Sequence, residues 1–134
     1  MYKLLFTLSL FAVLSAFTCK GKHGSSALEN KDWQLRTIIE DKVAHRPPAD
    51  VMITAMFKDG ALSGNGGCNS YNSTYTIIGD QLSLGMTAAT KMFCPANEWE
   101  TRYFRALEGT QSWKISDGKL TIRTTNGALL FEKP

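Results

Sequence analysis

The sequence predicts an α+β fold, a strongly curved, half-barrel-like antiparallel β-sheet of about seven or eight strands packed on a single α-helix. Three observations favour it. Short stretches alternate apolar and polar residues and are separated by two-residue turn signals. Only the segment after Pro95 has helical periodicity. The glycine-rich run at residues 63–71 interrupts the strands, and glycine in a regular element costs entropy and packs nothing, so this run predicts a shaped turn.

The first strand is expected at Trp33–Ile39, where apolar and polar residues alternate before the pattern loses phase at Ile38. Residues 42–50 contain Pro47 and Pro48, which lack backbone donors, so this part is a loop or a sheet edge.

The second strand is expected at Val51–Phe57, and Asp59-Gly60 after it predicts a hairpin turn. A second hairpin is expected at Gly79-Asp80. Residues 86–92 are mostly small, so they are expected to form a tight strand against the glycine-rich turn.

The helix is expected to begin at Asn97, with Glu100 as the reciprocal member of a capping box, and to end at Gly109. Glu98 and Arg102 are spaced for an ion pair on its exposed face. The positions expected to face the core are Trp99, Tyr103, Ala106 and Leu107, with Phe104 at the flank.

The C-terminal part is expected to be a meander of three strands. Asp117-Gly118 and Asn126-Gly127 are strong hairpin signals between its apolar stretches. No internal repeat of fixed period is apparent.

The N-terminus has the features of a secretory address. Lys3 precedes an uncharged, mostly apolar run at residues 4–17, which is too short to span a bilayer as a helix. Residues 14–19 resemble a bacterial lipobox, in which the cysteine becomes lipid-modified and N-terminal. We therefore predict a signal peptide at residues 1–18, a lipid-modified Cys19 with a flexible tether at residues 19–30, and a folded domain at residues 31–134. Plain secretion to a soluble periplasmic or extracellular location is the alternative.

With Cys19 lipidated, Cys68 and Cys94 remain as an even pair, which predicts a disulfide in an oxidising compartment. Three other interpretations stay open: a metal site, a catalytic thiol, and two reduced cysteines packed as small apolar residues. Two thiols and two loop histidines offer few metal ligands, so we expect no metal and no cofactor.

Composition is that of a soluble globular protein, with 43% hydrophobic and 20% charged residues. A net charge of +3 without a dense basic run gives no support to nucleic-acid binding. The glycine-rich run lacks the Lys-Ser/Thr ending of a phosphate loop. An enzyme would have to gather groups such as His45, Asp80, Glu98 and Glu100 in a cleft. These are ordinary surface residue types, and we expect no catalytic residues.

A set of residues at 31–133, nearly the whole mature chain, resembles the META domain of the HslJ type. The matching residues are Gly66-Gly67-Cys68-Asn69, Tyr71, Tyr75, Leu82, Thr90, Met92, Cys94, Glu100, Phe104, Ala106-Leu107, Trp113, Leu120, Ile122, Gly127 and Leu130-Phe131. Ser73 and Phe93 depart from the common family pattern, without threatening the fold. The resemblance implies a bacterial envelope protein, secreted or lipid-anchored, associated in some members with heat-shock or antibiotic stress. It brings no catalytic residues.

The leading hypothesis is a non-enzymatic, stress-related envelope domain, held on a membrane through Cys19, that binds an unidentified envelope protein or small ligand. Asn65, Asn69 and Tyr71 would be its contact turn if that turn is exposed, although turn geometry and the core also account for these residue types. The alternative is an inhibitor or chaperone-like module that acts on an envelope enzyme or on misfolded chains.

Overall fold

The structure, a computed structural model, describes residues 24–95 and 97–134. The predicted signal peptide and Cys19 lie outside the described residues. In chain order the elements are η1 (Ser25–Ala27), β1 (Trp33–Glu40), β2 (Val43–His45), β3 (Thr54–Lys58), β4 (Ala61–Asn65), β5 (Ser70–Ile78), β6 (Gln81–Leu84), β7 (Ala88–Ala89), α1 (Glu98–Glu108), β8 (Thr110–Ser116), β9 (Lys119–Thr124) and β10 (Gly127–Glu132).

The sheet confirms the expected fold class and goes further than a half-barrel, because it closes. In the described part of the chain, β1, β3, β4, β5, β6, β8, β9 and β10 form an antiparallel circuit in which β10 pairs back to β1. β2 pairs with β1 and β7 pairs with β5 outside that circuit. Closure leaves few unpaired strand edges.

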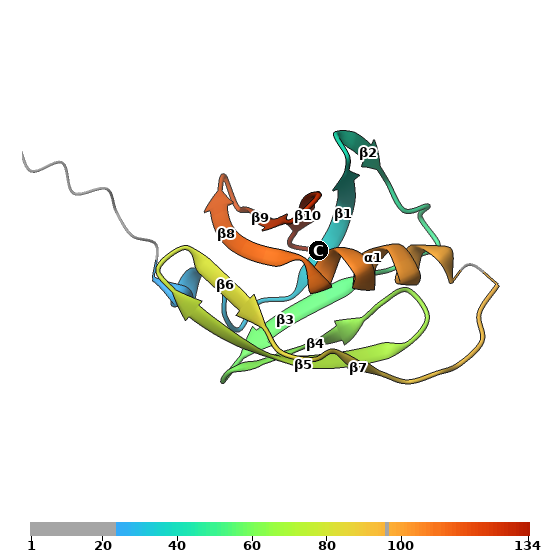
Figure 1. Ribbon diagram of the computed structural model, residues 1–134, viewed down its shortest axis with the longest axis horizontal. Helices are drawn as coiled ribbons and strands as arrows, with labels where there is room; N and C mark the ends of the chain where they lie inside the picture. Colours follow the sequence, from blue (N-terminus) through green and yellow to red (C-terminus); the bar gives the residue numbers. More distant parts are fainter. Residues whose placement is uncertain (1–23, 96) are drawn as a thin grey trace, which may run out of the picture.

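Helix α1 crosses the barrel between two groups of strands (Figure 1). Strands β1, β8, β9 and β10 lie on one side of the helix, and β3–β7 lie on the other. The predicted core stripe is confirmed: Tyr103 and Leu107 are fully buried, and Trp99, Phe104 and Ala106 pack against the core. The Tyr103 ring lies edge-on to Tyr71 of β5 at 5.6 Å and to Phe131 of β10 at 6.4 Å between centroids. One helical face thus joins strands from both halves of the barrel.

The loss of phase in the first strand has a structural cause. The register between β1 and β10 shifts between Leu35 and Thr37, which is a bulge or local irregularity. Thr37 and Ile38 are therefore both buried although they are adjacent in sequence. The bulge lets β1 keep its core contacts while the barrel bends.

Two of the predicted hairpin turns have the backbone that their sequences require. Asp59-Gly60 and Asp117-Gly118 have positive φ at both residues, 50° and 79° in the first and 53° and 73° in the second. Gly79 also has positive φ, at 63°.

The β1–β2 hairpin was not expected. Its turn, Asp41-Lys42, reaches φ values of 48° and 70° without a glycine.

The prediction of a turn at Asn126-Gly127 is off by one residue. Thr124 pairs with Gly127, so the turn residues are Thr125 and Asn126, and Gly127 begins β10. Gly127 also faces Glu40 of β1, and a Cβ atom there would collide with the carbonyl of Ile39. The glycine therefore serves the close approach of β10 to β1, which closes the barrel.

The helix ends differ from the sequence prediction. Asn97 makes no side-chain capping hydrogen bond, and the carboxylate of Glu100 is used elsewhere, so there is no capping box. Arg102 pairs with Glu40 of β1 at 2.9 Å and not with Glu98. Gly109 ends the helix with a φ of −88°, so its role needs no left-handed backbone.

Contacts with the barrel occur before residue 31. Leu28 is fully buried, and its carbonyl accepts a hydrogen bond from the indole N–H of Trp33 at 2.9 Å. The backbone N–H of Asn30 donates to the carbonyl of Phe57 at 2.8 Å. The part of residues 19–30 that lies within the described chain is thus attached to the barrel at Leu28 and Asn30.

Buried tyrosines make stability sensitive to alkali. Burial raises the pKa of Tyr71 and of Tyr103 well above the ordinary value near 10. Burial, with a hydrogen bond to Glu29, raises the pKa of Tyr75 to about 12. The folded state therefore keeps protons that the unfolded state loses above about pH 10, so the free energy of unfolding is expected to fall as pH rises beyond that value.

Chemical denaturation at about pH 9 and about pH 11 checks this expectation. Tyr103→Phe removes a hydroxyl that lies 2.6 Å from the Tyr71 oxygen and should cost about 1 kcal/mol at neutral pH. It should also reduce the alkaline loss, because one titrating group is gone. A wild-type free energy of unfolding that stays constant between the two pH values would contradict the assignment.

Candidate functional site

The glycine-rich run forms the predicted turn, between β4 and β5. Asn65 pairs with Ser70, and inside that pair the N–H of Gly66 donates to the Asn69 carbonyl at 2.8 Å. The N–H of Gly67 donates to the Asn65 side chain at 2.8 Å, and Gly67 has a φ of 110°, which favours glycine.

The carboxylate of Glu100 lies under this turn and holds it to the helix. One carboxylate oxygen, Oε2, accepts the N–H of Cys68 at 3.1 Å and the N–H of Asn69 at 2.6 Å. The other, Oε1, accepts the Asn69 side-chain amide at 2.7 Å. Glu100 is only 8% exposed. Three N–H donors therefore compensate for burial of the carboxylate.

Both sequence-based interpretations of Glu100, as the reciprocal member of a capping box and as an ordinary surface residue, are wrong. A signal was present: residues 100, 103 and 107 lie on one helical face, and all three are buried. A glutamate on the apolar face of helix α1 predicts a buried partner for its carboxylate.

Asn69 uses the rest of its side chain to hold residues 90–92. Its Oδ1 accepts the hydroxyl of Thr90 at 2.8 Å and the N–H of Met92 at 2.7 Å. Its Nδ2 also donates to the carbonyl of Met92 at 3.2 Å. One amide side chain thus links the turn, the helix and the chain that leads into the helix.

Further links fasten residues 85–94, which we call the clamped segment. At its end Cys94 forms the predicted disulfide with Cys68, with Cα atoms 6.0 Å apart. At its start the N–H of Gly85 donates to Thr74 at 2.9 Å, and Ser73 donates to the Gly85 carbonyl at 3.0 Å. Between these points β7 pairs with β5, as the small-residue stretch predicted.

The predicted contact turn is largely interior. Asn69 is 4% and Tyr71 2% exposed, and Asn65 is half-buried. Tyr71 donates to the Thr54 carbonyl at 2.8 Å. The interpretation of Asn69 and Tyr71 as contact residues is therefore wrong, and their roles are structural. The exposed side chains lie on the clamped segment beside the turn: Met86 is 95%, Met92 60% and Phe93 90% exposed.

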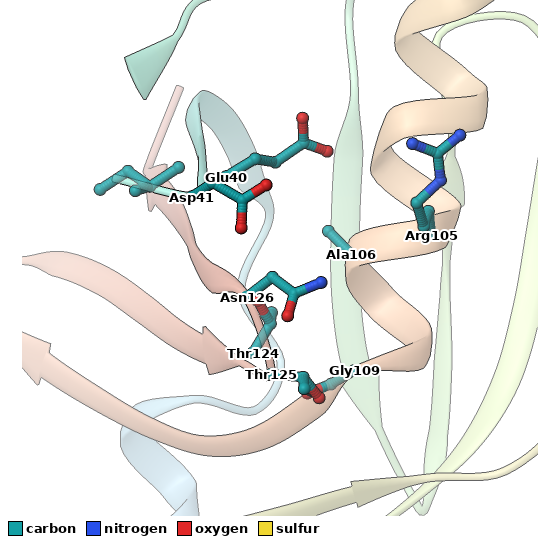
Figure 2. Close-up of a pocket in the computed structure, with 9 residues that line it drawn as sticks. Glu40, Asp41, Arg105, Ala106, Gly109, Thr124, Thr125 and Asn126 are labelled. Carbon is teal, nitrogen blue, oxygen red and sulfur yellow. The ribbon is translucent and has the colours of Figure 1, made fainter. Parts of the chain in front are cut away.

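A separate hollow of about 130 Å³ lies between the C-terminal half of α1 and two hairpin turns (Figure 2). Glu40, Asp41 and Asn126 line one side, and Arg105 lies on the helix. Glu40 is already paired with Arg102. The volume suits a small species at most.

The ionisable residues considered for catalysis do not gather in this hollow. Glu100 lies under the glycine-rich turn, Asp80 in the β5–β6 turn, and His45 on β2. Glu98 is exposed at the start of α1. Within residues 24–95 and 97–134 no three histidine, cysteine or acidic side chains form a group that could hold a metal ion.

Comparison with known proteins gives a family and a fold. The sequence model of the META domain matches residues 26–134. No curated protein matches the chain. A protein from Burkholderia xenovorans solved by NMR has a TM-score of 0.71 at 24% identity, over 85% of this chain and 88% of that one. A DUF4847 family protein from Bacteroides vulgatus has a TM-score of 0.60 at 13% identity, over 81% of this chain and 95% of that one.

Replacing Glu100 tests the centre of this network. Glu100→Gln puts an amide N–H₂ where a carboxylate oxygen accepts hydrogen bonds, so one buried donor is left facing another. We expect the free energy of unfolding to fall by about 2 kcal/mol.

Glu98→Gln is the matched control, since Glu98 is exposed two positions away on the same helix. It should change stability by less than about 0.5 kcal/mol. Equal effects of the two substitutions in urea denaturation would show that the buried carboxylate does not hold the turn.

Proposed function

The chain belongs to the META domain family, and from that premise we propose that it is a non-enzymatic, stress-related domain of the bacterial envelope, lipid-anchored at Cys19, that binds a protein partner through the clamped segment. The observation that carries the proposal is the exposure of Met86, Met92 and Phe93 on a segment that is fastened at both ends. Large apolar side chains at such exposure favour an interaction site when they gather on one segment.

Rigidity supports a binding role for these side chains. The disulfide and the Asn69 hydrogen bonds hold Met92 and Phe93 at a fixed place on the barrel, so less conformational entropy is lost when a partner covers them. The hollow of Figure 2 has a volume of about 130 Å³, which is below the roughly 300 Å³ of small-molecule pockets, so it gives little support to a small ligand at that place.

The cysteine pair supports a place outside the cytosol, because disulfides persist in oxidising compartments. The apolar leader and Cys19 supply the address and the anchor. No helix in the described residues is long and apolar enough to cross a membrane.

The same exposed residues also suit a chaperone-like module, which is the second candidate. The two differ in selectivity: a specific partner is recovered at fixed stoichiometry, whereas a chaperone-like surface suppresses aggregation of unrelated unfolded proteins.

The anchor is tested by Cys19→Ala. In cells that express the full chain, this variant should move from the membrane fraction to the soluble extracytoplasmic fraction, because the lipid attachment site is gone. Metabolic labelling with a fatty-acid analogue should mark the wild type alone. Retention of the variant with membranes would contradict the lipid anchor.

The binding surface is tested by the double substitution of Met92→Ser with Phe93→Ser. Chemical cross-linking in cells should give adducts with the wild type that this variant loses, since the apolar contact area is removed. Ile78→Ser is the matched control, because Ile78 is 75% exposed but lies at the β5–β6 hairpin. If the double variant keeps every adduct, the clamped segment is not the contact surface.

A further inference from the structure

The outer edge of β7 has unpaired main-chain groups. The N–H of Thr90 donates to the Ser70 carbonyl at 3.0 Å, so Thr90 is in a hydrogen-bonded pair with β5. Peptide groups alternate in direction along a strand, and the N–H and C=O of Ala89 therefore face away from β5. Among the described strands none pairs with this edge, and Ala88, Ala89 and Thr90 are exposed.

The outer edge of β2, which also has no partner among the described strands, is protected in the usual way. β2 is three residues long and is followed directly by Arg46, Pro47 and Pro48. A charge and two prolines hinder further strand pairing. The stretch at residues 86–93 has no proline, and Lys91 is its one charged residue. The small side chains of Ala88 and Ala89 leave the backbone accessible.

The edge of β7 is also held in place before any partner arrives. Gly85 is bonded to β5 at one end, and Met92 and Cys94 are bonded to the glycine-rich turn at the other. A strand that is already ordered loses little entropy when a second strand pairs with it. Met86 and Phe93, which flank the edge, add apolar surface at its two ends.

We infer that the outer edge of β7 binds an extended segment of the partner protein by strand addition. The inference rests on the proposed function and specifies how that binding occurs. The main chain of the segment pairs with Ala89 and its neighbours, and apolar side chains near the ends of the segment cover Met86 and Phe93. Lys91 is exposed and has no acidic partner among the described residues, so the segment carries an acidic side chain opposite it.

The probe for the test is a capped peptide of alternating threonine and valine with one central glutamate. A second peptide of the same sequence carries N-methyl groups on alternate backbone nitrogens, which removes the donors of one edge. Binding to the oxidised full chain in detergent micelles is followed by NMR through the backbone amides of β7 and β5. We expect the plain peptide to shift the amides of residues 87–91, and the methylated peptide to leave them unchanged.

Ala89→Pro removes the outward N–H but leaves the hydrogen bonds between β7 and β5 in place. This variant should bind the plain peptide with an affinity about tenfold lower or more, as expected for loss of a main-chain hydrogen bond at a strand edge. Ala89→Thr, which keeps the N–H, is the matched control and should bind as the wild type does. Lys91→Glu should weaken binding through charge repulsion. Should Ala89→Pro fail to fold, the two peptides on the wild type still decide the question.

Three results would overturn strand addition. The first is no binding of the plain peptide to the wild type, and the second is equal binding of both peptides. The third is a wild-type dimer that Ala89→Pro dissociates, because a second copy of the chain would then occupy the edge. Failure of the proposed function is a different result. If the Met92 and Phe93 substitutions remove the cellular adducts but the plain peptide does not bind, the partner surface stands and strand addition is wrong. If they remove no adduct, the proposed function itself is wrong.

Discussion

The glycine-rich turn and the clamped segment depend on the hydrogen bonds that the buried carboxylate of Glu100 accepts. Burial of a charge costs several kcal/mol unless hydrogen bonds compensate for it, and here two backbone N–H groups and one side-chain amide do so. Helix α1 must lie close to the glycine-rich turn for these hydrogen bonds to form. A Cβ atom on residue 66 would lie 2.7 Å from the Phe104 ring and 2.9 Å from the carboxylate, so glycine at that position is a condition of the contact. The turn and the helix are therefore complementary in shape and in charge.

Local patterns in the sequence were sufficient for the fold class. Alternation located β1, and the Asp-Gly pairs located two hairpins, because both signals depend on neighbouring residues. The disulfide pairing was also accessible, since only two cysteines remain after Cys19. Barrel closure, the partner of Arg102 and the place of Gly127 were not accessible, because each depends on a strand far away in the sequence.

The candidate site shows the same division. The glycine-rich run predicts the turn, but it leaves both an exposed contact role and a structural role open for the polar residues, because asparagine and tyrosine suit exposed turns and interiors equally well. In the structure the Asn69 side chain has hydrogen-bond partners in two other segments, residues 90–92 and helix α1, and no short window of sequence contains them all. The exposed residues of the clamped segment were overlooked because Met92 and Phe93 have the composition of core residues. Their exposure follows from the Cys68–Cys94 disulfide and the Asn69 bonds, which fix the backbone around them.

The pairing of β1 with β10 has a consequence for the order in which the barrel forms as the chain is synthesised. These are the first and last strands of the barrel, and their register runs from Gln34–Glu132 to Glu40–Gly127. The N-terminal strand is therefore synthesised long before the strand that completes its pairing. Closure of the barrel waits until synthesis is almost finished, because contacts between distant parts of a chain form late.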